Sequence, residues 1–326
     1  MSEKLRKTIE DIEKKFGRGT IMSFDETMDY SLKRVPSGSL FLDIILGGGY
    51  PLGRIIEIIG PESSGKSTVL LHAIRETQKS GNVAAYIDME QAFDPIYASN
   101  IGIDLSPDKF VFSQPDTAEQ CLSIVEKLLE SGEVSFIGVD SVAAMVPTAE
   151  SEGEFGESKM GLHARLMSQA MRKLVAKVNK SNCVLFFTNQ LRDMMGVMYG
   201  PTETTTGGNA LKYYASIRLD IRRKSIDKDS EAQAISNTVR VKTIKNKTYP
   251  PFKECTFKIL YGIGISHEDE IFEACVENDI IKKSGSWYSY KEKKLGQGKD
   301  NCLQVIQDLG IMDELESQVR EMYGLI

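Results

Sequence analysis

Long apolar runs, paired cysteine motifs and an excess of positive charge are all missing from this sequence. No apolar run approaches the roughly 18 residues that a membrane-spanning helix needs, which argues against a helical membrane protein. Residues 1–4 lead into alternating charge, so we expect no signal peptide and a cytoplasmic location. Because the net charge is −6, any binding to nucleic acid requires a local groove.

The cysteines and histidines are few and scattered. None of the five cysteines belongs to a CxxC pair, and the three histidines are equally far apart in the chain. This spacing favours reduced thiols in a cytosolic protein over disulfides or a structural metal site. The residues concerned are Cys121, Cys183, Cys255, Cys275, Cys302, His72, His163 and His267.

Residues 60–67 read GPESSGKS, which matches a phosphate-binding loop at every required position. The apolar residues 55–59 predict a buried strand that enters this loop, and residues 68–74 predict a helix that leaves it. A glycine-rich turn is the alternative. Specified positions between a strand and a helix rarely coincide by chance, so a nucleotide site is strongly favoured.

Each required residue type of the loop has a chemical role. Gly60 and Gly65 allow backbone N–H groups to turn inward around a polyphosphate. Lys66 supplies a positive charge to the terminal phosphates, and Ser67 offers a hydroxyl ligand to Mg²⁺. The N-terminus of the following helix adds the positive end of its dipole. The sequence therefore predicts a nucleotide bound with magnesium.

The chain divides into three predicted parts. Residues 1–36 form an N-terminal arm, whose helix ends at Gly17 and carries one apolar stripe: Leu5, Ile9, Ile12 and Phe16. The stripe suits either its own domain or a neighbouring subunit. In residues 37–265 strands and helices alternate, which predicts an α/β core with a mostly parallel sheet covered on both faces. Residues 266–326 predict a small α/β C-terminal domain with an acidic helix, a glycine- and lysine-rich hairpin and a terminal helix.

Three predicted strands of the core end in polar residues at the edge where ligands bind open α/β sheets. Asp140 closes an apolar run and suits a carboxylate that holds Mg²⁺ through water. Glu90 follows another strand and could orient or deprotonate the attacking water, although a solvated loop glutamate has the same spacing. Gln190 ends a third strand, where an amide could sense the γ-phosphate and pull on the segment that follows.

Two long segments leave the same edge of the sheet, residues 150–161 and 191–208. The second is too long and too rich in glycine and threonine for a routine connection, and such loops are usually functional. It also carries Met194, Met195 and Tyr199 without a helix or strand period. Apolar side chains on such a loop could stack on the bases of a single strand. The two segments therefore predict a DNA site switched by ATP.

The sequence resembles the bacterial RecA recombinase family over essentially all of residues 5–299. The motifs that carry the resemblance are IEKKFGRGTIM, GPESSGKST, DPIYA, SQPDTAEQ, VDSVAAMVP, MSQAMRKL, TNQLR, GPTETTTGGNALKYYASIRLDIRR, IKNK and GSWYSYKEKKLGQGK. The resemblance implies an ATP-dependent recombinase that forms filaments on single-stranded DNA and exchanges strands with a homologous duplex. It also implies DNA-stimulated ATP hydrolysis, self-assembly through the arm, and a LexA-type repressor as a partner.

The resemblance assigns roles residue by residue. It implies that ATP is bound by Gly60, Pro61, Glu62, Ser63, Ser64, Gly65, Lys66, Ser67 and Thr68, with Asp94, Tyr97 and Tyr261 around the adenine. Glu90 is implied as the catalytic carboxylate, Gln190 as the γ-phosphate sensor, and Ser67 and Asp140 as the residues that support Mg²⁺. Lys245 and Lys247 are implied to reach ATP across the subunit interface, while Lys212, Tyr213 and Arg218 couple that interface to the DNA loop. The implied DNA contacts are Met160, Arg165, Arg172, Met194, Met195, Gly207 and Gly208, with Lys283 and Lys299 on a duplex-capturing face.

Three positions and the C-terminus depart from the family pattern. Gln91 follows Glu90 where a histidine is common, and Asp193 and Met194 stand where an apolar and a basic residue are frequent. An aspartate beside the DNA path repels phosphate, so we expect weaker DNA binding or an altered salt dependence. The sequence stops at Ile326 without the usual acidic tail, from which we expect weaker autoinhibition.

Two other functions remain open on the residues alone. A ring-forming relative of the helicase or clock type would explain the phosphate loop and Asp140. It would not explain the N-terminal arm, the IKNK segment and the lysine-rich hairpin together. A regulator that binds ATP and partner proteins without exchanging strands is the second alternative.

Overall fold

The structure of the chain is a computed structural model that describes residues 1–17, 20–21, 32–153, 161–193 and 203–325. The chain forms two units, Met1–Lys33 and Arg34–Ile326. In the first unit, α1 (Glu3–Phe16) begins at Ser2, whose hydroxyl accepts a hydrogen bond from the Leu5 N–H, and ends at Gly17. The predicted helix is therefore confirmed. None of its residues is buried, and Leu5 and Phe16 are 50% and 65% exposed.

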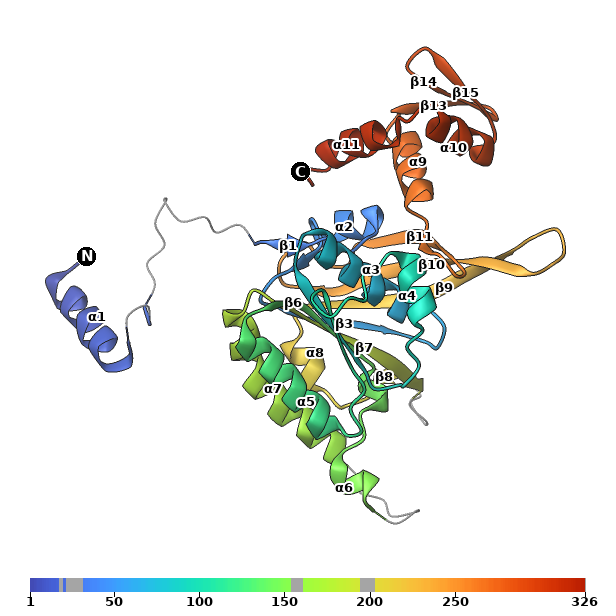
Figure 1. The fold of residues 1–326 in the computed structure, drawn as a ribbon. Coiled ribbons are helices and arrows are strands. Elements are labelled where there is room, and N and C mark those ends of the chain that lie inside the picture. The colour runs from blue at the N-terminus through green and yellow to red at the C-terminus, as the bar shows by residue number, and fades with distance from the viewer. Residues whose placement is uncertain (18–19, 22–31, 154–160, 194–202, 326) are drawn as a thin grey trace. The chain divides into compact units, whose positions relative to one another are not determined.

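The second unit is built around one large sheet (Figure 1). Within the described residues it has ten strands, in the order β12-β11-β10-β9-β3-β7-β6-β4-β5, and β8 pairs with β7. The strands are β3 (Ile55–Gly60), β4 (Val83–Asp88), β5 (Phe110–Ser113), β6 (Val134–Asp140), β7 (Val184–Asp193), β8 (Glu203–Thr205), β9 (Ile217–Lys228), β10 (Ala234–Asn246), β11 (Glu254–Leu260) and β12 (Gly264–Ile265). A short two-stranded sheet of β1 (Arg34–Val35) and β2 (Tyr50–Pro51) lies outside it.

Strands β3, β4, β5, β6, β7 and β9 are mutually parallel, as predicted. The remaining edge, β9 to β12, is antiparallel because β9 and β10 are joined by a short turn, which only antiparallel strands can use. This pair forms a long hairpin that projects from the sheet (Figure 1). The core is thus a mostly parallel sheet with an antiparallel extension.

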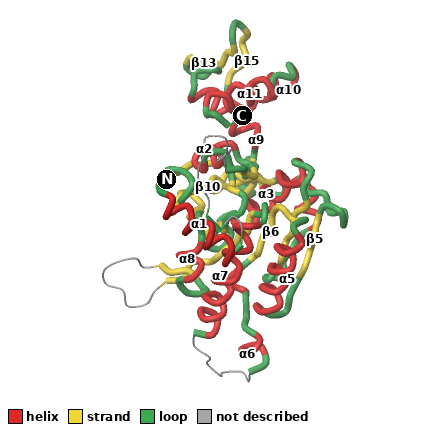
Figure 2. Tube along the Cα trace, turned by 90° about the vertical axis from the view of Figure 1, so that its left-hand side faces the viewer, coloured by secondary structure: helices red, strands yellow, loops and turns green. Residues whose placement is uncertain are grey.

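Helices cover both faces of the sheet, and each face has its own apolar cluster. The first cluster includes residues of α2 (Leu40–Leu46), α3 (Lys66–Lys79) and α4 (Pro95–Ile101). The second includes residues of α5 (Ala118–Ser131), α7 (Leu162–Lys180) and α8 (Ala210–Tyr214). Helices α5 and α7 lie side by side in both views (Figures 1 and 2). Two short helices, η1 (Val142–Ala144) and α6 (Thr148–Ser151), follow β6.

The C-terminal part has a third apolar cluster. The elements of the C-terminal part are α9 (His267–Glu277), β13 (Ile281–Ser284), β14 (Trp287–Tyr290), β15 (Lys293–Gln297), α10 (Lys299–Asp308) and α11 (Met312–Met322). The sequence predicted a hairpin and one terminal helix here. The structure has three strands, because the turn after Tyr290 starts a further strand, and Gly310 separates two helices.

One further part of the core differs from the prediction. The segment 191–208, predicted to be irregular, begins in β7 and includes β8 before the turn at Thr206 and Gly207, since Leu191 pairs with Thr205 and Asp193 with Glu203.

No helix in the described part of the chain is long and apolar enough to span a membrane. All five cysteines are free, as expected, and Cys255 alone among them is not fully buried. The described ranges contain no cluster of three or more histidine, cysteine or acidic side chains that could hold a metal ion.

Candidate active site

The phosphate loop connects the fully buried strand β3 to helix α3. At Gly60 a Cβ atom would lie 2.3 Å from the Ile221 backbone oxygen, so no side chain fits there. Gly65 has φ +97, and a Cβ atom on it would lie 2.6 Å from the Ile259 side chain. Gly60 is therefore required for the close packing of the loop against the sheet, and Gly65 also for the left-handed backbone of its turn.

Lys66 is the first residue of α3 and is almost completely buried. Its Nζ donates to the Pro61 carbonyl at 2.7 Å and to the Gly60 carbonyl at 3.1 Å. Burial lowers the pKa of this ammonium, and the nearby carboxylates of Asp140 and Glu90 oppose that shift. A positive charge is thus held at the mouth of the loop, where a polyphosphate would meet it.

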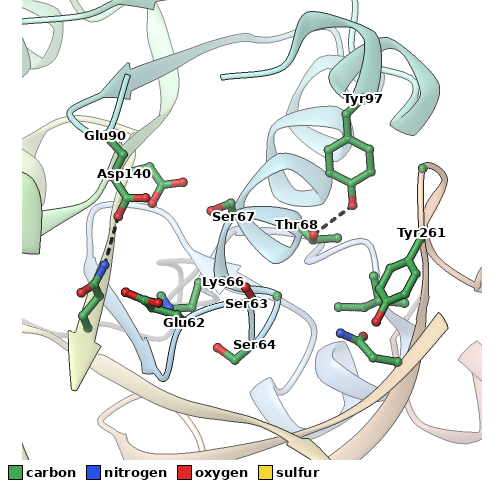
Figure 3. Close-up of a pocket in the computed structure, with 15 residues that line it drawn as sticks. Glu62, Ser63, Ser64, Lys66, Ser67, Thr68, Glu90, Tyr97, Asp140 and Tyr261 are labelled. Atoms are coloured by element: carbon green, nitrogen blue, oxygen red, sulfur yellow. Dashed lines mark hydrogen bonds between the residues drawn. The ribbon is translucent and has the colours of Figure 1, made fainter. Parts of the chain in front are cut away.

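A cavity of about 470 Å³ opens at the carboxyl ends of the parallel strands (Figure 3). Glu90 and Asp140 lie on one side of it, Tyr97 and Tyr261 on the other, and Lys66 and Ser67 between them. The residues that line it are Glu62, Ser63, Ser64, Gly65, Lys66, Ser67, Thr68, Glu90, Tyr97, Asp140, Gln190, Asn237, Ile259, Tyr261 and Gly262. Most of the residues predicted for ATP therefore meet in one place.

Asp140 ends β6 and is buried. Its Oδ2 accepts a hydrogen bond from the Tyr86 hydroxyl at 2.8 Å, and its Oδ1 accepts one from the Thr188 hydroxyl. Burial and the Asp140 charge raise the pKa of Tyr86, so the phenol stays a donor. The two hydroxyls fix the orientation of the carboxylate, and each oxygen keeps a lone pair for a water ligand.

Glu90 lies beyond the end of β4, and its Oε1 accepts from the Ser141 hydroxyl at 2.5 Å. The Gln190 amide also reaches this oxygen, at 3.5 Å. Asp88 shapes the turn, because its two oxygens accept from the backbone N–H groups of Glu90 and Phe93. The carboxylate and amide predicted from separate strand ends are therefore in contact.

The aromatic side of the cavity is also ordered by hydrogen bonds. The Tyr97 hydroxyl and the Thr68 hydroxyl are 2.9 Å apart, which ties α4 to α3. Asp94 caps α4 by accepting from the N–H groups of Ile96 and Tyr97, and it does not line the cavity. Tyr261, in the turn after β11, is 43% exposed.

Sequence reasoning missed three lining residues. Gly262 lies in the turn after β11, and the other two are Asn237 and Ile259. They come from β10 and β11, whose place beside the loop depends on the antiparallel extension of the sheet. Asn237 is buried, and its Oδ1 is a buried acceptor without a partner among the described residues. No sequence motif marks Asn237. A buried side-chain oxygen that lacks a partner and lines a cavity indicates a contact with a ligand.

Lys245 and Lys247 do not line this cavity. Lys245 pairs with Arg218, and Asn246 pairs with Ile217, which in turn pairs with Ile56 near the start of β3. The phosphate loop follows the other end of β3. At the usual rise of a strand, that end lies about 13 Å from Ile56. Lys245 Nζ donates to the Lys212 and Tyr213 carbonyls, both at 2.9 Å. Burial lowers its pKa to about 8, with Lys247 and Arg218 adding to the shift.

The predicted DNA contacts are described only in part. Met160, Met194, Met195 and the side chain of Asp193 lie outside the described part of the structure. Arg165 and Arg172 are exposed on α7, about two helical turns apart on one face. Gly207 and Gly208 have φ values of +78 and +74 and pack closely against Val142 and Ala164.

The two lysines predicted on the C-terminal part have different surroundings. Lys283 is exposed on β13, with its ammonium 5.6 Å from the centre of the Tyr288 ring. Lys299 forms ion pairs with Asp269 at 2.6 Å and with Glu273 at 2.5 Å. The charge of Lys299 is therefore largely offset within the chain, which weakens its case as a DNA contact.

Comparison with known proteins decides the family. A model of the RecA N-terminal domain matches residues 3–266, and a model of the RecA C-terminal domain matches residues 269–324. The chain belongs to the RecA family. It is 51% identical to Protein RecA of Clostridium novyi over 323 residues, which cover 98% of this chain and 91% of that one. It is 52% identical to Protein RecA of Bacillus subtilis over 319 residues, which cover 97% and 91% of the two chains.

As a RecA-family protein, the chain is a DNA-dependent ATPase that acts in DNA recombination and repair and in the SOS response. Family membership also entails nucleotide use, DNA binding and self-assembly. The ring-forming and non-recombining alternatives are not favoured, because RecA proteins match nearly the whole chain and both domain models are present.

Proposed function

We propose that this cavity binds and hydrolyses ATP, and that the bound nucleotide controls a recombinase filament on single-stranded DNA that pairs with a homologous duplex. The observation that carries the proposal is the meeting of Lys66, Asp140, Glu90 and Gln190 in one cavity beside the origin of the 191–208 segment. A phosphate-binding charge, a candidate base and a sensor amide are thus next to the segment proposed to bind DNA.

Magnesium fits the oxygen donors of the cavity. Ser67 offers a hydroxyl directly, and Asp140 offers a fixed carboxylate through water. Phosphate oxygens and water would complete the coordination of the ion. Bound there, Mg²⁺ would neutralise charge on the phosphates.

Hydrolysis is proposed to use Glu90 as the base. Its carboxylate is held by Ser141 and lies across the cavity from the phosphate loop, where it can accept a proton from a water beside the γ-phosphate. Gln190 contacts the same carboxylate, so a change at the γ-phosphate can reach β7 and the segment after it. Tyr97, Tyr261 and Asn237 are proposed to hold the base of the nucleotide.

Lys245 and Lys247 are proposed to act on the nucleotide of a neighbouring subunit. Their position beside the start of β3, away from the phosphate loop, supports a role in trans because they do not line the cavity of their own chain. A heterologous interface of this kind repeats into a helical filament. The exposed stripe of α1 is proposed to dock on the same neighbour.

The remaining assignments follow the three-part division of residues 1–36, 37–265 and 266–326. Segments 150–161 and 191–208, with Arg165 and Arg172, are proposed to bind the first strand. Lys283 and its surroundings are proposed to bind the duplex, with Lys299 as a weaker candidate. A LexA-type repressor is proposed as a partner of the filament, and action on DNA supports a cytoplasmic location.

Glu90→Gln tests the proposed base, because it removes the basic carboxylate with almost no change in shape. We expect ATP hydrolysis stimulated by single-stranded DNA to fall by about 10²–10⁴-fold, the usual contribution of a positioned base. Nucleotide affinity and ATP-dependent assembly on DNA should be retained. The control is Glu292→Gln, an exposed position between β14 and β15, which should hydrolyse ATP like the wild type. Wild-type hydrolysis by Glu90→Gln would contradict the assignment.

A further inference from the structure

Glu57 is a charged residue in the middle of the fully buried strand β3. Its side chain has no exposed surface. Its backbone partner on β9 is Arg218, whose Nε–H donates to Glu57 Oε2. Burying an ion pair costs desolvation energy that the attraction often fails to repay, so stability alone explains such a pair poorly. An apolar residue would serve the strand as well, which suggests another role for the carboxylate.

The second carboxylate oxygen of Glu57, Oε1, contacts strand β7, which flanks β3 on the side opposite β9. The side-chain nitrogen of Asn189, Nδ2, donates to Glu57 Oε1 at 3.0 Å and to the Thr206 carbonyl at 3.2 Å. The side-chain oxygen of Asn189, Oδ1, accepts from the Gln190 N–H at 2.9 Å and from the Thr206 hydroxyl. Both ends of this buried amide are therefore used, and its orientation is fixed by four hydrogen bonds.

Thr206 occupies a junction in the chain. It follows β8, where the segment that left the sheet after Gln190 returns, and it precedes Gly207 and Gly208, which pack on Val142 and Ala164. Asn189 thus joins the origin of the 191–208 segment to its return, one residue before the amide that reaches Glu90. Glu57 fixes this asparagine to the strand that enters the phosphate loop.

We propose that Glu57 is a positioning residue that, through Asn189, holds Thr206 and Gln190 in one arrangement and so makes DNA affinity depend on the bound nucleotide. The inference rests on the proposed function and concerns regulation of the same site. Without the network, the nucleotide still binds and the segment still meets DNA. The two events are then no longer linked through the junction at Thr206.

The test uses Thr206→Val, which removes the hydroxyl and keeps the shape of the side chain. The affinity for a fluorescent oligothymidylate is measured with a non-hydrolysable ATP analogue and with ADP, and the ratio of the two affinities is compared with that of the wild type. We expect the ratio to fall by about fivefold, the usual effect of one lost hydrogen bond. Thr206→Ser, which keeps the hydroxyl, should restore the wild-type ratio.

The matched control is Thr256→Val on β11, a half-buried sheet position outside the network, which should keep the wild-type ratio. A merely structural role for Thr206 would lower the melting temperature and leave the ratio unchanged, and this result would overturn the proposal. Glu57→Gln is the direct variant and should lower the ratio at least as far. If Glu57→Gln fails to fold because Arg218 loses its partner, the affinity ratio of Thr206→Val decides the test. A wild-type ratio near one would instead contradict the proposed function itself.

Discussion

At Gly60 the chain has no room for a side chain. The backbone oxygen of Ile221, on the neighbouring strand β9, occupies the place that a Cβ atom would take. The glycine therefore sets how closely the loop approaches the sheet, in addition to letting its N–H groups face a phosphate. This closeness also places Ile259 against Gly65, so the antiparallel strands form part of the nucleotide cavity.

Gly60→Ala should abolish tight nucleotide binding, because the loop must move away from β9 to accept the methyl group. Overpacking of this kind also costs about 1–3 kcal/mol of stability. The control is Gly81→Ala, an exposed turn glycine with φ +80 and open space around it. It should lose about 1 kcal/mol of stability through backbone strain and bind nucleotide normally. Binding of a fluorescent ATP analogue checks both, and normal affinity for Gly60→Ala would refute the packing argument.

At the scale of elements, α9 caps helix α2 with a buried carboxylate. Glu270 Oε1 accepts from the Ser39 hydroxyl at 2.5 Å and from the Phe41 N–H at 3.3 Å, and Oε2 accepts from the Leu40 N–H at 3.1 Å. The cap joins the start of the C-terminal part to the core. Burial raises the pKa of Glu270 to about 7, despite these donors.

This raised pKa predicts how stability depends on pH. The contribution of Glu270 is fully present below its unfolded pKa of 4.5 and is lost as the pH rises through about 7. Compared with Glu270→Gln, the free energy of unfolding of the wild type should fall by about 3 kcal/mol across this window. The variant also loses an acceptor, but this loss does not change with pH. Urea denaturation at a series of pH values measures the difference.

Glu277→Gln, at the exposed end of the same helix, is the control for that experiment. Its difference from the wild type should stay nearly constant over the same pH window. A constant difference for Glu270→Gln as well would show that the carboxyl is not held by the fold in its protonated form.

The parts of the site that could be predicted are those fixed by parallel strands. Asp140, Glu90 and Gln190 lie at or near the carboxyl ends of parallel strands that must meet at one edge, so their proximity follows from their place in the sequence. Asn237 could not be found this way, since its strand is antiparallel and its neighbours depend on the order of the whole sheet. Glu57 did carry a signal, a charge inside an apolar strand, but its partners come from distant strands.

In the whole molecule, the two proposed halves of the catalytic site lie at separate places on the sheet. The phosphate loop, Glu90 and Gln190 lie at the carboxyl end of β3, and Lys245 and Lys247, at and just after the end of β10, lie beside its amino end. One chain therefore cannot bring both halves together, which agrees with the self-assembly of the family. We therefore propose that ATP is hydrolysed between subunits.

Mixing two inactive variants tests this claim most directly. Glu90→Gln damages the nucleotide face, and the double variant Lys245→Ala with Lys247→Ala damages the lysine face. In an equimolar mixture on single-stranded DNA, some junctions combine both intact faces, and we expect about a quarter of wild-type ATP hydrolysis. A mixture of Glu90→Gln and Lys66→Ala, which damage the same face, should stay inactive. Activity of the first mixture no higher than that of its separate components would contradict a site shared between subunits.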